Sequence, residues 1–323
     1  MPLLDYFASL NPLNLLKSFP ASISQGLIWG IMAIGVYITF RLLDVADLTV
    51  DGSFTTGGAC AVMLILAGWP SWAALIVAFF AGVLAGLATG LLHTKLGIPA
   101  ILAGILTQFA LYSVNLHIMG MASNKSLNPD KYRLLLTSRR IPSAILVGAL
   151  FTLVLIAILY WYFGTEQGSA IRATGNNPAM SRAQGINIDR MKVIGLALSN
   201  GIVALSGGLM AQYQSFSDIN MGRGAIVIGL AAVIIGEVLG EAILGKRLNF
   251  FGRLAFIAVG GVIYYIVVSV VLWLKLDSND LKLFTAVIVA VFLAIPYLKR
   301  QARTSFRSAA KRAAKEKGGE ENA

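Results

Sequence analysis

The chain has 323 residues, of which 57% are hydrophobic and 13% are charged, and its formal net charge is +11. Because the apolar residues come in long blocks, this composition excludes an ordinary soluble domain and indicates an integral membrane protein. The positive charge does not indicate nucleic-acid binding. Residues 299–323 alone carry eight positive and three negative charges, and they lack the interleaved aromatic residues of a nucleic-acid surface.

Nine apolar runs predict about nine transmembrane helices, with a range of eight to ten. A helix satisfies its backbone hydrogen bonds internally, and roughly 20 residues cross a hydrocarbon core of about 30 Å. The runs are 23–40, 54–67, 72–92, 98–119, 141–163, 193–210, 225–239, 254–274 and 283–298. The second, seventh and ninth are short, which indicates broken or tilted helices or misplaced boundaries. The expected fold is therefore an all-α, polytopic integral membrane protein.

The regions outside these runs divide the chain. Residues 1–21 lack the features of a cleaved signal peptide and form a moderately amphipathic stretch, expected to lie along the membrane interface. Residues 22–298 are expected to form the transmembrane domain. Residues 299–323 are expected to be a cytoplasmic tail that anchors the topology and touches anionic lipid. Cys60, the only cysteine, falls inside the second run and is interpreted as core filling.

A polar segment, residues 165–192, interrupts the apolar chain between the fifth and sixth runs. Its centre, residues 168–190, has the sequence GSAIRATGNNPAMSRAQGINIDR. A turn between two spans needs only a handful of residues. A long, basic and helix-patterned connection therefore indicates a docking surface for another protein.

The Lys and Arg residues predict the orientation, because cytoplasmic loops near span ends are enriched in them. Nine spans with the polar segment and the C-terminus in the cytoplasm place 17 basic residues inside and nine outside. The connection 120–140 does not fit this orientation, since it carries five basic residues on the outer side. Either this loop meets an acidic partner or the span count is wrong there. We expect a multi-pass protein of the cell membrane with a cytoplasmic C-terminus.

Two short stretches show internal symmetry. VADLTVDGSFTTGGA follows the first run and FSDINMGRGAIVIGL follows the sixth, and at an offset of 171 Asp47 pairs with Asp218 and Thr49 with Asn220. An odd number of spans separates them, so the copies are expected to face opposite sides of the membrane. This predicts two inverted-topology half-repeats, 22–120 and 193–298, joined by the fifth run and the polar segment.

No catalytic site and no metal site is expected in the chain. HExxH, GxSxG and GxxxxGK[ST] are all absent from the sequence, so any ATP must be bound by another subunit. Some polar residues lie within the apolar runs, such as Gln108, Asn115 and Asn200. Each of them, taken alone, is interpreted as a hydrogen-bonding group between helices in preference to a ligand contact. Asp47 and Asp51, near Arg41, are interpreted as an interfacial cap or ion pair.

The residue order of the polar segment resembles the coupling segment of ATP-binding cassette (ABC) importer permeases. The matching residues are IRATG at 171–175, NNP at 176–178, SR at 181–182 and GINIDRMK at 185–192. The resemblance covers about residues 22–298 and is closest to branched-chain amino acid and ribose permeases. The variants LTVDGSF and LGKRLNFFGR are most similar to permeases that work with tryptophan- or tyrosine-type binding lipoproteins. The residues that the resemblance assigns to ATPase contact are Arg172, Gly175, Asn176, Asn177, Pro178, Arg182 and Gly185.

This resemblance implies that two permease copies, expected to be identical, form the path. It further implies two ATPase subunits, which hold ATP and Mg, and an extracytoplasmic substrate-binding protein. The chain itself is expected to need no cofactor. The path is expected between the half-repeats, lined by Thr49, Ser53, Gln108, Asp218 and Asn220. The expected solute is a small zwitterion such as an amino acid, with an aromatic one as the finer expectation. The alternative is an ion-coupled secondary transporter that uses Asp47, Asp51 or Asp218.

Overall fold

A computed structural model of the chain describes residues 12–245 and 248–274, together with six scattered positions between 283 and 294. The chain divides into two compact units, residues 1–276 and 277–323. Every helix and strand named below lies in the first unit. The basic tail lies outside the described residues. So does the predicted ninth run, apart from the scattered positions.

Helices make up most of the first unit, and eight of them correspond to the first eight apolar runs. The helices are α2 (Pro12–Tyr37), the π-helical η1 (Ile38–Leu42), α3 (Val50–Leu66), α4 (Ser71–Thr94), α5 (Ala100–Ile118), α6 (Ile141–Gly164), α7 (Glu166–Asn176), α8 (Pro178–Ala183), α9 (Ile188–Gln214), α10 (Ala225–Leu244) and α11 (Phe250–Trp273). Strands β1 (Asn124–Ser126) and β2 (Phe216–Asp218) pair antiparallel. Seven helices in the described part of the chain are long and apolar enough to cross a membrane, and α3 is a shorter apolar helix. The prediction of an all-α, polytopic membrane protein is confirmed, while the total of nine spans stays a prediction.

The two short runs within the described residues have different causes. The seventh run was bounded too tightly, because α10 continues beyond residue 239 to Leu244. Within α10, the carboxylate of Glu237 accepts a bond from Nε of Arg41 at 2.9 Å and forms an ion pair with that residue. The second run is short in the structure as well, since α3 has only 17 residues.

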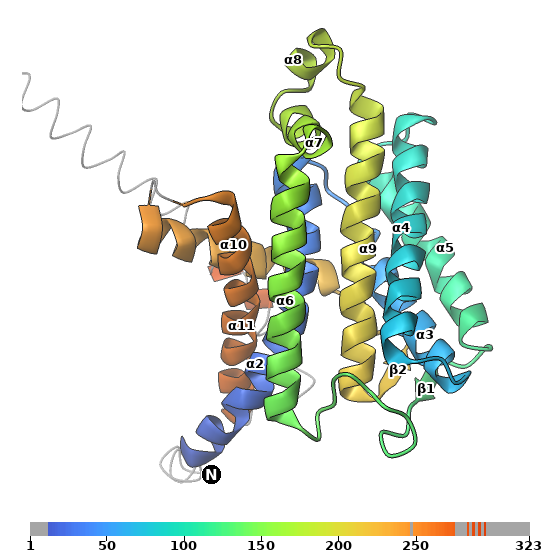
Figure 1. The fold of residues 1–323 in the computed structure, drawn as a ribbon, viewed down its shortest axis with the longest axis vertical. Coiled ribbons are helices and arrows are strands. Elements are labelled where there is room, and N and C mark those ends of the chain that lie inside the picture. The colour runs from blue at the N-terminus through green and yellow to red at the C-terminus, as the bar shows by residue number, and fades with distance from the viewer. Residues whose placement is uncertain are drawn as a thin grey trace, which may run out of the picture. The chain divides into compact units, whose positions relative to one another are not determined.

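Helix α9 lies at the centre of the packing, against α2, α3 and α4 (Figure 1). Small residues allow backbone contact: a Cβ on Gly57 of α3 would overlap the carbonyl oxygen of Ala204, and a Cβ on Gly207 would overlap that of Phe54. Helices in a bilayer gain little hydrophobic attraction for one another, so close packing holds them together. Trp29 of α2 stacks on Phe54 with ring centroids 4.8 Å apart.

The helical bundle of the first unit has two opposite ends. Helices α7 and α8 lie at one end, and strands β1 and β2 lie at the other (Figure 1). A non-helical connection enters the bundle from each end: residues 43–49 from the α7–α8 end, and residues 215–224 from the β1–β2 end. They meet at Asp51, in the first turn of α3, whose carboxylate accepts bonds of 2.9 Å from the backbone N–H groups of Gly224 and Ile226. Asp51 thus supplies acceptors for the unpaired N–H groups at the start of α10.

The two connections contain the same turn at aligned positions. The N–H of Thr49 donates to Oδ1 of Asp47 at 2.9 Å, and the N–H of Asn220 donates to Oδ1 of Asp218 at 2.8 Å. Both are turns in which an aspartate side chain accepts from the backbone two residues later. This local likeness agrees with an inverted repeat. The pairing of two complete halves stays a prediction, because the second half extends beyond the described residues.

Candidate functional site

Arg172 attaches the polar segment to the helical bundle. Its guanidinium donates to the carbonyl oxygen of Phe163 at 2.8 Å and lies over the ring of Phe250, 5.6 Å from the ring centroid. The Phe163 carbonyl is among the last of α6 and lacks a partner within its own helix, and a cation is favoured at this end of a helix. Arg172 therefore holds α7 against α6 and α11 rather than projecting freely outward.

Gly175 provides a second attachment. A Cβ at this position would overlap the carbonyl oxygen of Leu42, at the end of η1. Only glycine permits this approach of α7 to another backbone. Because η1 continues from α2, the contact links the polar segment to a helix of the central packing.

Helix α8 and its flanking turns form an exposed tip, residues 176–185. Asn177 caps α8, since its Oδ1 accepts from the N–H of Met180 at 3.0 Å, and Pro178 takes the first helical position. Gly185 follows with a φ of +81°, a left-handed conformation that favours glycine. The predicted contact residues on this exposed surface are Asn176, Asn177, Pro178, Arg182 and Gly185. The side chain of Met180 is also 58% exposed there.

Two of the predicted path residues, Thr49 and Ser53, lie in a buried polar network. Oγ of Ser53 donates to Oδ1 of Asn200 at 2.6 Å, and Nδ2 of Asn200 donates to Oδ2 of Asp47 at 2.6 Å. Oγ1 of Thr49 lies 2.7 Å from Oγ1 of Thr89. All five residues are at most 3% exposed. The bonds join α3, α4, α9 and the connection 43–49, so these polar groups are satisfied by contacts between elements.

Gln108, a third predicted path residue, lines a cavity of about 360 Å³. The cavity lies between α3, α5 and the connection 215–224. Its lining consists of Asp51, Gly52, Thr55, Gln108, Phe109, Tyr112, Asn115, Ile219 and Arg223. Pockets that hold small molecules measure about 300–1,000 Å³, so this volume suits a small solute.

The two remaining predicted path residues lie beside this cavity in the chain but are absent from its lining. Asp218 is half-buried in β2, and Asn220 is exposed. Sequence reasoning assigned Asp51 to an interfacial cap or an ion pair. It is a cap, but of α10, and Arg41 forms its ion pair with Glu237 instead. In the sequence, a structural role for Asp51 was indicated by its position inside one of the two aligned stretches.

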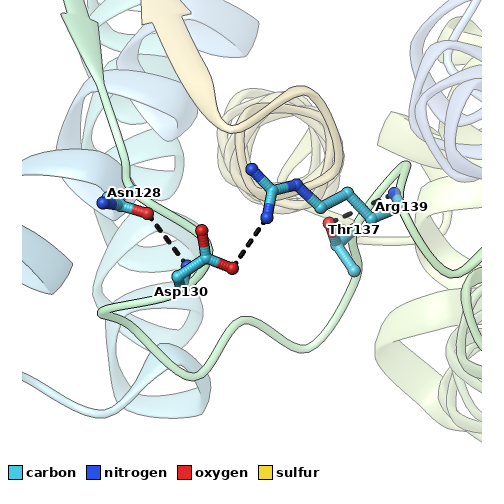
Figure 2. Close-up of polar contacts among 4 residues, drawn as sticks. All are labelled: Asn128, Asp130, Thr137 and Arg139. Carbon is cyan, nitrogen blue, oxygen red and sulfur yellow. Dashed lines mark hydrogen bonds and ion pairs between the residues drawn. The ribbon is translucent and has the colours of Figure 1, made fainter.

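The connection 119–140 folds back onto the β1–β2 end. Leu127 and Leu136 are at most 4% exposed, and β1 pairs with β2. Figure 2 shows the ion pair within this loop, in which Nη1 of Arg139 lies 2.7 Å from Oδ1 of Asp130. Three further basic residues are exposed there: Lys131, Arg133 and Arg140. The loop therefore presents a largely basic surface on an ordered framework.

The similarity to known proteins covers most of the chain. The family described as the permease component of the branched-chain amino acid transport system matches residues 19–296. A tyrosine transport system permease protein of Clostridioides difficile (strain R20291) is 40% identical over 271 residues, covering 84% of this chain and 88% of that protein. An uncharacterized protein of Rickettsia prowazekii (strain Madrid E) is 33% identical over 284 residues, covering 87% and 97%. The autoinducer 2 import system permease protein LsrC of Yersinia pestis (strain Pestoides F) is 28% identical over 245 residues, covering 74% and 66%. No solved structure matches the chain.

Proposed function

Because the chain belongs to the family of branched-chain amino acid transport permeases, we propose that it is the membrane-spanning subunit of an ABC importer for an amino acid. The observation that carries this proposal is the exposed tip 176–185, which stands on α7 at one end of the bundle (Figure 1). Its conformation is defined by a cap, a proline and a left-handed glycine, as suits a surface that docks on a partner. The tyrosine permease relative supports an aromatic amino acid as the solute.

The work of this subunit is mechanical. ATP and Mg²⁺ are held by a pair of separate ATPase subunits, whose closure displaces the exposed tip of each permease copy. Arg172 ties α7 to α6 and α11, and Gly175 ties it to η1, so the displacement reaches the helices directly. From η1 the chain continues through the connection 43–49 into α3, next to the cavity. Movement at the tip can therefore alter access to the cavity.

The opposite end of the bundle is proposed to face outward and to receive a substrate-binding protein. The exposed residues Lys131, Arg133 and Arg140 suit an acidic surface on that protein, because charge complementarity steers encounter and sets register. A second, identical permease copy is proposed to complete the path. The C-terminus then lies in the cytoplasm together with the exposed tip.

The proposal is tested by co-expressing the chain with an ATPase and a binding protein encoded beside its gene. Met180→Asp and Arg182→Glu alter exposed side chains of the tip, and both are expected to reduce ATPase co-purification and uptake while the permease remains folded. Lys17→Glu, an exposed charge reversal at the other end of the chain's first span, is the matched control for co-purification. Wild-type co-purification by both tip variants contradicts the assignment of the tip. Uptake that persists without any ATPase favours the ion-coupled carrier.

A further inference from the structure

The cavity between α3, α5 and the connection 215–224 contains an arginine that is held on a rigid turn. The N–H of Gly222, before Arg223, donates to Oγ1 of Thr55 at 3.1 Å, and the N–H of Gly224, after it, donates to Oδ2 of Asp51 at 2.9 Å. These bonds fix the backbone on both sides of Arg223. Arg223 is an exposed residue, and its guanidinium takes part in neither of the ion pairs found among the described residues. A planar guanidinium in this state is suited to bidentate binding of a carboxylate.

Asn115 supplies an unsatisfied acceptor on the cavity wall. It is 1% exposed, and its Oδ1 has no hydrogen-bond partner, while its Nδ2 makes only a long contact of 3.5 Å with the carbonyl oxygen of Gly52. A buried acceptor without a donor is costly, and native structures generally pair such groups with protein, water or ligand. Gln108 and Asp51, whose carboxylate also caps α10, line the cavity as well. This part of the wall therefore favours a ligand that donates hydrogen bonds and carries positive charge.

Two aromatic side chains provide the third feature of the cavity. Phe109 is 73% exposed and Tyr112 is 45% exposed, and both line the cavity on α5. Aromatic surfaces bind flat or bulky apolar groups at little entropic cost. The cavity thus combines a carboxylate receptor, hydrogen-bond acceptors beside a negative charge, and an apolar face.

We propose that this cavity is a binding site within the permease for an α-amino acid with a large apolar side chain. Arg223 binds the carboxylate, Asn115 and Gln108 accept from the ammonium group, and Phe109 and Tyr112 contact the side chain. A neutral sugar leaves both charges unmatched, and a simple anion meets the repulsion of Asp51. The inference rests on the proposed importer function and deepens it, because it places solute recognition in this chain as well as in a binding protein.

The test measures ligand binding to the full-length permease, purified with its ATPase in lipid nanodiscs. The twenty standard amino acids are compared first, and the tightest binder is then compared with its amide, which lacks the carboxylate, and its deaminated analogue, which lacks the ammonium group. We expect each analogue to bind at least about 10-fold more weakly than the amino acid, as for loss of a charge-assisted hydrogen bond. Arg223→Gln is expected to weaken binding of the amino acid but not of the amide, and Arg223→Lys to restore part of the loss. Asn115→Leu is expected to weaken binding of the amino acid but not of the deaminated analogue.

Lys95→Gln changes an exposed cation at the end of α4, away from the cavity, and is expected to leave binding unchanged. The inference is overturned if none of the twenty amino acids binds saturably to the wild-type complex. It is also overturned if Arg223→Gln binds the amino acid and its amide with wild-type affinities. When the ATPase still co-purifies, either result leaves the importer function standing and removes only this site. Failure of the wild-type permease to retain any ATPase contradicts the importer function itself.

Discussion

Replacing Arg172 by Ala should loosen α7 from the bundle, whereas replacing Arg182 by Ala should not. The Arg172 side chain makes a hydrogen bond of 2.8 Å from a charged donor and a cation–π contact at 5.6 Å. Such a hydrogen bond contributes about 1.5–3 kcal/mol. The ring contact contributes about 0.5–1 kcal/mol. Together they stabilise the docked α7 by roughly 2–4 kcal/mol. Since 1.36 kcal/mol corresponds to a factor of ten, amide exchange in α7 should accelerate about 30- to 900-fold.

Hydrogen exchange followed by mass spectrometry on the intact complex measures this effect over residues 165–177. Arg182 is exposed, so Arg182→Ala is expected to change local stability by about 0.5 kcal/mol or less while still reducing ATPase co-purification. Unchanged exchange in Arg172→Ala, combined with lost ATPase binding, would show that Arg172 contacts the ATPase directly. That outcome would refute its role as the attachment of α7.

Three further predictions follow from particular contacts. Gly175→Val should abolish uptake because its side chain overlaps the last carbonyl of η1, whereas Gly164→Ala, at a position with open space, should transport normally. A cysteine placed at the exposed Ser126, in a cysteine-free background, should react with an impermeant thiol reagent in intact cells; reaction only after lysis would reverse the proposed orientation. Asn200→Leu removes the amide that donates to the buried carboxylate of Asp47 and should destabilise the protein by about 1–3 kcal/mol. A wild-type melting temperature of the purified Asn200→Leu protein would show that the network is dispensable.

The sequence by itself determined the class of protein and the nature of its polar segment. Long apolar blocks predict membrane-spanning helices, because lipid offers no hydrogen-bond partner for an unpaired backbone group. The first eight runs are helices for this reason. The residue order of the polar segment likewise indicated a helix-patterned connection, and in the structure Asn177, Pro178 and Gly185 bound the short helix α8 because capping, proline geometry and left-handed glycine act within a few residues.

Only the tertiary structure decided which polar side chains hold helices together and which line a cavity. Thr49, Ser53 and Gln108 are all polar residues in or beside apolar runs, but the first two find partners on neighbouring elements and the third lines the cavity. Asp51 binds the start of α10, more than 170 residues away in the chain. A local pattern contains no information about partners this distant. The attachment of Arg172, the partners of Asp51 and the lining of the cavity therefore emerge only when the helices are packed.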